Sequence, residues 1–372
     1  MTRSRFLLVF ALVLVLRIAV AAGFRGNFDT QSYLIAVQGV VSGQNVYALT
    51  ERYNYSPLWS FVVAGVWLVA SPNVGAFVLL VGLLLIAADA ASTFLLIGIG
   101  RRRLGLDADE AQRRALLFFS NPVSVLISCA HGQFDGLSIL FLLAALWLAV
   151  GPRSRASQAG VAGMLAMSLL VKHVTAFHPL LFSRRRQQEG LPDGLVLAPY
   201  LVFAASFLPY ASAVEPILRH VFLYPARVSE ASLQKPGGFQ AFLSLAEPRP
   251  VVFSLLLLVA VACVLRATRR WELTRACLLL FLTLLCFSPS FAVQYLVWPI
   301  ALGSLFPSAA YGLFTLAGSL YHSSAPESLA IPWPIRATSL GTWLAALLWF
   351  AAELLRARRE QERWVAVPES AG

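Results

Sequence analysis

"VGAFVLLVGLLLIAADAASTFLLIGIG", residues 74–100, decides the fold of this chain, and "RRRLGLDADEAQRR", residues 101–114, follows it directly. An apolar run of this length crosses a bilayer as an α-helix, because about 20 residues span a hydrocarbon core of about 30 Å. The arginines after it are typical of a short cytoplasmic loop, where basic residues collect. The stretch therefore predicts a transmembrane helix that enters the cytoplasm near residue 100.

The composition extends this interpretation to the whole chain of 372 residues. Hydrophobic residues make up 58% of it and charged residues only 13%, whereas about a quarter of a soluble domain is charged. We therefore predict an all-α polytopic membrane protein. The net charge of +11 comes from arginines in short loops between apolar runs, a pattern that indicates orientation in the membrane and not nucleic-acid binding.

The first 70 residues indicate which segments face the cytoplasm and which face the outer side of the membrane. Arg3 and Arg5 hold the N-terminus in the cytoplasm, and residues 6–22 read as an uncleaved first helix. The segment from 23 to 56 is then an outer loop, within which residues 30–43 suit a short helix in the membrane interface. The apolar run 57–70 is too short to cross, so we expect a re-entrant or interfacial helix there.

The remaining apolar runs alternate between the two sides of the membrane. The total is about 12 transmembrane helices (10–13), with the N- and C-termini both cytoplasmic. Residues 1–357 form one transmembrane domain, with a second outer loop at 212–246 and a cytoplasmic tail at 358–372. Spans are predicted at 115–130, 136–151, 157–171, 173–183, 194–211, 248–267, 274–290, 292–306, 308–321 and 338–355.

Polar residues gather at the outer ends of these spans. Ionisable groups beside or within a span are costly and mark functional candidates. Because the orientation rests on the basic loops alone, this convergence predicts a site on the outer face. The residues concerned are Asp29, His131, Gln133, Asp135, Lys172, His173, Gln294, Tyr295 and Trp298, with Glu215, Arg219, His220 and Arg227 in the second outer loop.

Structural roles compete with these functional ones. Asp89, inside a span, is also explained as a paired polar residue of the helix bundle, and Tyr295 and Trp298 as part of an interfacial aromatic belt. His131 and Asp135 would hold a metal together only on one helical turn, and the nearby glycines argue against such a turn.

"FDTQSYLIAVQGVVSGQNVYALTERYNYSPLW", residues 28–59, resembles the first outer loop of GT-C glycosyltransferases. The likeness is strongest to the mannosyltransferase that adds the first mannose to glycosylphosphatidylinositol, and to its prokaryotic relatives. It covers about residues 24–182 and returns near 288–300. The matching elements are Asp29, Gly43 with Tyr47, the run Tyr53, Tyr55, Pro57 and Leu58, the intramembrane Asp89, the "NP…S…G..D" pattern from Asn121 to Asp135, and "QYLVW" from Gln294.

This resemblance implies a sugar donor carried on a polyprenyl phosphate, a lipid or glycan acceptor, and an inverting transfer at the outer face of the plasma membrane. Asp29 would be the catalytic base. The eukaryotic enzyme has an Asp-x-Asp motif here, and in this chain Asn27 replaces its first aspartate while Asp29 keeps the second. A requirement for Mg²⁺ or Mn²⁺ is therefore left open, and no other cofactor is implied. Substrate binding would fall to Asn27, Tyr33, Tyr55, His131, Gln133, Asp135, Gln294, Tyr295 and Trp298, and binding of the donor phosphate to Lys172, His173, Arg219 and Arg227.

Two other functions fit the same residues. A transporter or flippase for a lipid-linked sugar would use them as a pathway, although such carriers are typically built from paired halves, which this sequence lacks. The second alternative function is that of a non-catalytic subunit of a cell-envelope assembly.

The sequence contains no Walker or Rossmann glycine motif that would indicate a nucleotide-sugar site. The identity of the sugar stays open between mannose, arabinose, glucose and galactose.

Overall fold

The fold is helical throughout the residues that the computed structural model describes, which are 2–150, 154–183, 191–222, 250–269, 271–288, 291–325 and 331–365. Within these ranges the backbone pairs outside helices and turns only at one isolated bridge, Ser183 with Leu191. The predicted all-α class is confirmed.

Several helices follow the predicted apolar runs, but three predicted spans are not continuous helices. Residues 115–130, 173–183 and 292–306 are broken into short helical pieces. The short helix at 57–70 has the expected bounds, and the interfacial segment of the first outer loop is helical from Phe28. In chain order they are α1 (Arg3–Gly23), α2 (Phe28–Val41), α3 (Val46–Leu49), α4 (Pro57–Ala70), α5 (Val74–Arg103), α6 (Ala108–Phe119), α7 (Pro122–Val125), α8 (Asp135–Leu148), α9 (Arg155–Val171), α10 (Asp193–Ala205), α11 (Val214–Ile217), α14 (Pro250–Ala267), α15 (Leu273–Phe287), α16 (Ile300–Gly303), α17 (Ala309–Ser324) and α18 (Ile335–Val365).

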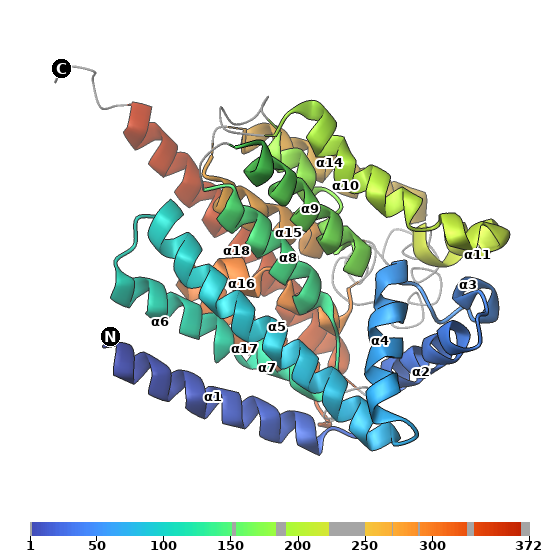
Figure 1. The fold of residues 1–372 in the computed structure, drawn as a ribbon. Helices are drawn as coiled ribbons and strands as arrows, with labels where there is room; N and C mark the ends of the chain where they lie inside the picture. Colours follow the sequence, from blue (N-terminus) through green and yellow to red (C-terminus); the bar gives the residue numbers. More distant parts are fainter. Residues whose placement is uncertain are drawn as a thin grey trace.

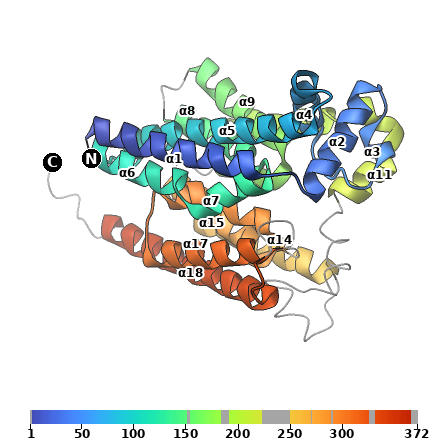
Figure 2. The same cartoon turned by 90° about the horizontal axis from the view of Figure 1, so that it is seen from below.

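The two ends of the molecule differ in what they contain. Helices α2, α3, α4 and α11 gather at one end, whereas α1 begins and α18 finishes at the other (Figures 1 and 2). The arginines that end α5 lie at that second end. Helix α18 continues past Ala357 to Val365, so the first part of the predicted tail is helical.

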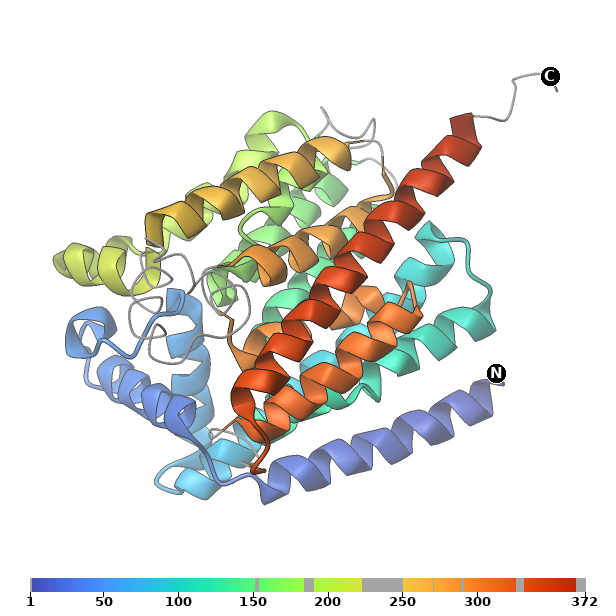
Figure 3. The same ribbon diagram turned by 180° about the vertical axis from the view of Figure 1, so that it is seen from behind.

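Helix α15 is the centre of the largest apolar cluster. Its residues from Ala276 to Cys286 are all buried, which is the pattern of a helix packed on every side. Helices α17 and α18 lie along each other, and α18 packs against α15 (Figure 3). Helix α1, in contrast, exposes Leu8, Leu12 and Val15, and such a surface is stable where the solvent is lipid.

Three of the described helices are long and apolar enough to cross a membrane: α1, α5 and residues Ile335–Arg359 of α18. The segments Asp193–Ala205 and Leu208–Phe222, bent by 50°, would together make a fourth. These helices indicate that the chain associates with a membrane. Other apolar helices have 10–17 residues, fewer than a full crossing needs, so the count of about twelve spans stays a prediction.

A buried ion pair joins α1 to its neighbours. Arg17 and Asp89 are almost fully buried, and Arg17 Nη1 donates to Asp89 Oδ2 at 2.7 Å. The guanidinium also donates to the Phe119 carbonyl at 2.9 Å and to Ser124 Oγ at 2.8 Å. This confirms the interpretation of Asp89 as a paired residue of the bundle, and it explains why an arginine interrupts the first apolar run.

We expect Arg17→Met to lower the free energy of unfolding by about 3–5 kcal/mol, because it leaves the Asp89 carboxylate buried without its counter-charge. The double variant Arg17→Met/Asp89→Leu removes both charges and is expected to recover most of that loss. Thermal unfolding of the purified protein in detergent measures both effects. Arg5→Met, an exposed arginine on the same helix, is the control and changes stability by less than about 0.5 kcal/mol. Equal losses in the single and double variants would contradict the pairing.

Candidate active site

The first turn of α2 fixes the position of Asp29. Asn27 caps the helix, since its Oδ1 accepts from the Thr30 backbone N–H at 3.1 Å and its own N–H donates to Thr30 Oγ1 at 3.2 Å. Asn27 Nδ2 also donates to the His131 carbonyl at 3.0 Å, which clips α2 to a distant part of the chain. Asp29 follows in the first turn, where the helix dipole stabilises a negative charge.

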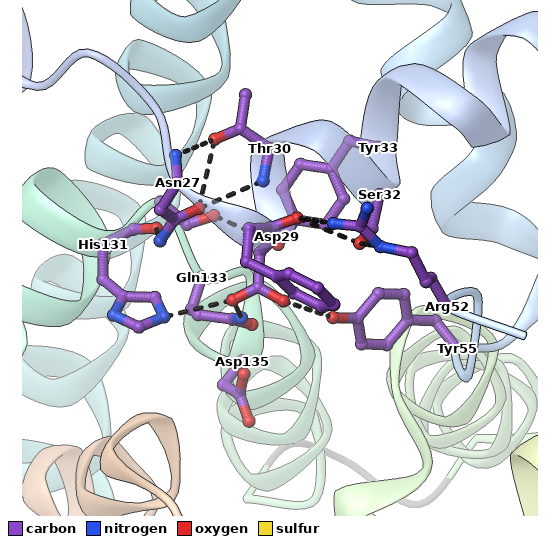
Figure 4. A network of polar contacts seen from close by, with 12 residues as sticks. Asn27, Asp29, Thr30, Ser32, Tyr33, Arg52, Tyr55, His131, Gln133 and Asp135 are labelled. Atoms are coloured by element: carbon purple, nitrogen blue, oxygen red, sulfur yellow. Dashed lines mark hydrogen bonds and ion pairs between the residues drawn. The ribbon is translucent and has the colours of Figure 1, made fainter. Parts of the chain in front are cut away.

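The turn between residues 131 and 134 supplies two donors to Asp29. A π-helical turn, Leu126–His131, ends at Gly132, whose φ of +70° favours glycine because it has no β-carbon. Helix α8 begins only at Asp135, so His131 and Asp135 do not share a helical turn, as the glycines predicted. His131 Nε2 lies 3.1 Å from Asp29 Oδ2, and Gln133 Nε2 donates to the same oxygen at 2.6 Å (Figure 4).

The segment before α4 supplies the third donor. The Tyr55 hydroxyl donates to Asp29 Oδ1 at 3.1 Å (Figure 4). Arg52 holds this segment against α2, because its Nη2 donates to the Phe28 carbonyl at 2.7 Å and its Nε to Ser32 Oγ at 3.1 Å. The guanidinium carbon also lies 3.7 Å from the centre of the Phe28 ring.

The Asp29 carboxyl is held in its ionised form by these partners. Burial by itself raises the pKa of Asp29, but the hydrogen bonds from His131 and Gln133 and the nearby charges of His131 and Lys172 outweigh it and hold the pKa below its usual range. The side chain remains 18% exposed. Asp29 therefore presents a negatively charged oxygen to its surroundings at neutral pH.

A second group of hydrogen-bonded polar side chains, centred on Asp135, lies next to the group around Asp29. Lys172 Nζ lies 2.5 Å from Asp135 Oδ2, and the Trp298 indole N–H donates to Asp135 Oδ1 at 2.6 Å. Gln133 connects the two groups, because its Oε1 accepts from Lys172 Nζ at 3.5 Å while its amide nitrogen faces Asp29. Asp135 is fully buried, so Lys172 compensates its charge.

A cleft of about 370 Å³ opens over both groups. Its lining contains both polar and apolar side chains, and the apolar ones include Val174, Phe177, Leu257 and Leu284. Residues predicted from the sequence that line it are Asp29, Tyr55, Lys172, His173, Gln294, Tyr295 and Trp298; polar lining residues that the sequence analysis missed are Glu51, Arg52, Asn54 and Ser288.

Other predicted residues lie away from the cleft lining. His131, Gln133 and Asp135 stand behind it and hold its polar side chains, and Asn27 serves as the helix cap. Tyr33 is buried and donates from its hydroxyl to the Gly132 carbonyl at 3.3 Å. None of these side chains is among those lining the described cleft.

The predicted phosphate-binding residues divide in the same way. Lys172 and His173 line the cleft, whereas Arg219 is exposed and does not. Arg227 and most of the second outer loop lie outside the described residues.

Among the residues described, no three His, Cys, Asp or Glu side chains come close enough to hold a metal ion.

Comparison with protein families finds no matching family, and comparison with curated proteins finds no similar protein. The geometry of the cleft is therefore the basis on which a function is proposed.

The lowered pKa of Asp29 predicts a pH dependence of stability. An aspartate in an unfolded chain titrates at about 3.9, so the contribution of this carboxylate is fully present above that pH and is lost as the pH falls through the lower pKa of the folded state. We expect the Tm of the wild type to exceed that of Asp29→Asn at pH 7, and the difference to shrink below about pH 4. Asp109→Asn, at an exposed position of α6, is the control. A difference independent of pH would show that the ionised form is not the one being stabilised.

Proposed function

We propose that this chain is an integral-membrane glycosyltransferase that moves a sugar, with mannose as the first candidate, from a polyprenyl-phosphate donor to a lipid or glycan acceptor. The observation that carries the proposal is the Asp29 carboxylate, ionised and accessible in a cleft that is lined by both polar and apolar side chains. A lipid-linked sugar, with its polar head and apolar tail, offers partners to both kinds of side chain.

The reaction uses Asp29 as the general base. The acceptor hydroxyl forms a bond to the anomeric carbon and gives its proton to Asp29. The bond from that carbon to the phosphate oxygen breaks on the opposite face, and polyprenyl phosphate leaves with the electron pair, so that the configuration is inverted. A base has to lie about 3 Å from the hydroxyl it deprotonates, a distance that an exposed Asp29 oxygen permits.

The low pKa of Asp29 decides when the proton moves. A weak base does not remove a proton from an alcohol in the ground state, and the ideal base has a pKa near the working pH. The acceptor hydroxyl becomes acidic only as its bond to the anomeric carbon forms. We therefore assign a late proton transfer, with Asp29 first orienting the hydroxyl and facing the positive charge that develops on the sugar.

Arg52 is the cation best suited to the leaving phosphate. Its hydrogen bonds all go to neutral acceptors, the Phe28 carbonyl, Ser32 and Gln31. Lys172 also lines the cleft, but its charge is compensated by Asp135 at 2.5 Å. An arginine free of a carboxylate partner within the described residues binds phosphate through a planar fork of donors.

Other residues that line the cleft suit the sugar ring and the isoprenyl chain of the donor. The Tyr295 and Trp298 rings stack at 4.4 Å, and such an aromatic shelf beside Gln294 offers an apolar face and an amide to a sugar ring. Val174, Phe177, Leu257 and Leu284 would contact the first isoprenyl units. We place the cleft on the outer side of the plasma membrane with both termini cytoplasmic, because the arginines that end α5 lie at the opposite end of the molecule.

Asp29→Asn is expected to slow transfer by about 10²- to 10⁴-fold, the usual contribution of a general base. The purified protein is reconstituted in liposomes with polyprenyl phosphates carrying mannose, glucose, galactose or arabinose and with extracted membrane lipids as acceptors. Release of polyprenyl phosphate reports turnover whatever the acceptor is.

Asp193→Asn, at an exposed position at the start of α10, is the matched control and keeps wild-type turnover. Full activity of Asp29→Asn would remove Asp29 as the base. Movement of the labelled donor across the bilayer without transfer would indicate a carrier instead, and wild-type behaviour in cells after replacing Asp29 and Asp135 together would indicate a non-catalytic assembly subunit.

Arg52→Gln is expected to raise the KM for the donor by about 10- to 150-fold, because it removes a charge-assisted hydrogen bond worth about 1.5–3 kcal/mol to the phosphate. Arg52→Lys keeps the charge and is expected to recover part of the loss. Arg219→Gln, which changes an exposed arginine outside the cleft, is the control. If Arg219→Gln raises the KM and Arg52→Gln does not, the donor phosphate is bound elsewhere.

A further inference from the structure

A second groove, of about 380 Å³, lies along α6 at the arginine-rich end of the molecule. Helix α6 is amphipathic: Ala111, Ala115 and Phe119 are buried, whereas Asp109 and Arg113 are exposed. The groove runs from the charged turn of this helix toward the break that precedes α7. It is lined by Glu110, Arg113, Arg114, Leu116, Leu117, Ser120 and Pro307.

Two arginines and one glutamate line the charged end of the groove, and Asp107 and Asp109 lie outside the lining in the turn before them. Glu110 accepts from both arginines, with 2.6 Å to Arg113 Nη2 and 2.6 Å to Arg114 Nε. Glu110 is the one acidic side chain among the described lining residues, so two guanidinium groups face one carboxylate. This end of the groove is therefore complementary to a singly charged anion.

The two arginines differ in how firmly they are held. Arg114 also donates to the Leu305 carbonyl and forms a fixed floor. The Arg113 side chain is 60% exposed and has Glu110 as its ion-pair partner, which leaves donors of its fork directed outward. An arginine in this state can turn toward a phosphate while Arg114 keeps Glu110 in place.

The other end of the groove is apolar. Leu117 is 43% exposed, and Pro307 lies beside the groove at an exposed position. From Arg113 to Leu117 the helix rises about 6 Å, at 1.5 Å per residue. A phosphate held at Arg113 would thus be followed, along the same groove, by an apolar surface at the depth where an acyl chain begins.

We propose that this groove binds an anionic phospholipid, with the phosphate between Arg113 and Arg114 and one acyl chain along Leu117. Basic pockets beside membrane helices bind anionic headgroups, and each arginine near the surface contributes about 1 kcal/mol. The site lies at the end of the molecule opposite the Asp29 cleft (Figure 2). It fixes the depth and tilt of the molecule in the leaflet that faces its arginines, independently of the proposed transferase activity.

The test is a lipid titration by native mass spectrometry of the purified protein in detergent. Phosphatidylglycerol and phosphatidylcholine with identical acyl chains are added in turn. We expect phosphatidylglycerol to be retained preferentially and Arg113→Gln to weaken its binding about five-fold, which corresponds to about 1 kcal/mol. Arg101→Gln, an exposed arginine at the end of α5 outside the groove, is expected to keep wild-type affinity.

Further variants keep the result interpretable. Arg113→Lys retains the charge and is expected to bind phosphatidylglycerol more tightly than Arg113→Gln does. The Tm of each variant in detergent without added lipid shows whether it is folded. Leu117→Gln is expected to weaken binding of phosphatidylglycerol without affecting competition by inorganic phosphate. Equal losses in Arg101→Gln and Arg113→Gln, or equal retention of the two lipids by the wild type, would overturn the proposal. Competition by inorganic phosphate together with no effect of Leu117→Gln would reduce the groove to a general anion site.

Discussion

A charge buried among apolar helices is stable only when an opposite charge and hydrogen bonds accompany it. Among the buried ion pairs of the described residues, two lie close to the helices that form the site. Arg17 with Asp89 holds α1 against α5 and against the Phe119 carbonyl. Lys172 with Asp135 joins the residue after α9 to the start of α8, and Trp298 ties that pair to the segment before α16.

The requirement that a buried charge be paired distinguishes Asp29 from Asp89 and Asp135. Asp89 and Asp135 are 0–1% exposed and each faces a cationic partner, so they serve the architecture. Asp29 is 18% exposed and is held by Tyr55, Gln133 and His131. Its charge is stabilised but still accessible, which is the condition for chemistry with a substrate.

Much of the candidate site followed from the sequence. The arginine-rich loops predicted an orientation in which Asp29, Lys172, Gln294, Tyr295 and Trp298 would share one side, and these residues do line one cleft. Arg52 was missed because an arginine beside a glutamate in a loop looks like an ordinary exposed pair. Asn27 was expected at the substrate and instead caps α2, a role that depends on where the helix begins and on the distant His131 carbonyl.

The sequence by itself determined the helical class and the bounds of segments such as 57–70, because hydropathy acts locally and additively along the chain. Only the tertiary structure decided which charges are paired and which stay accessible. Arg17 and Asp89 are 72 residues apart in the chain, and Asp29 and Gln133 are 104 apart. Such partners are selected by the packing of whole helices, for which no short stretch of sequence carries a signal.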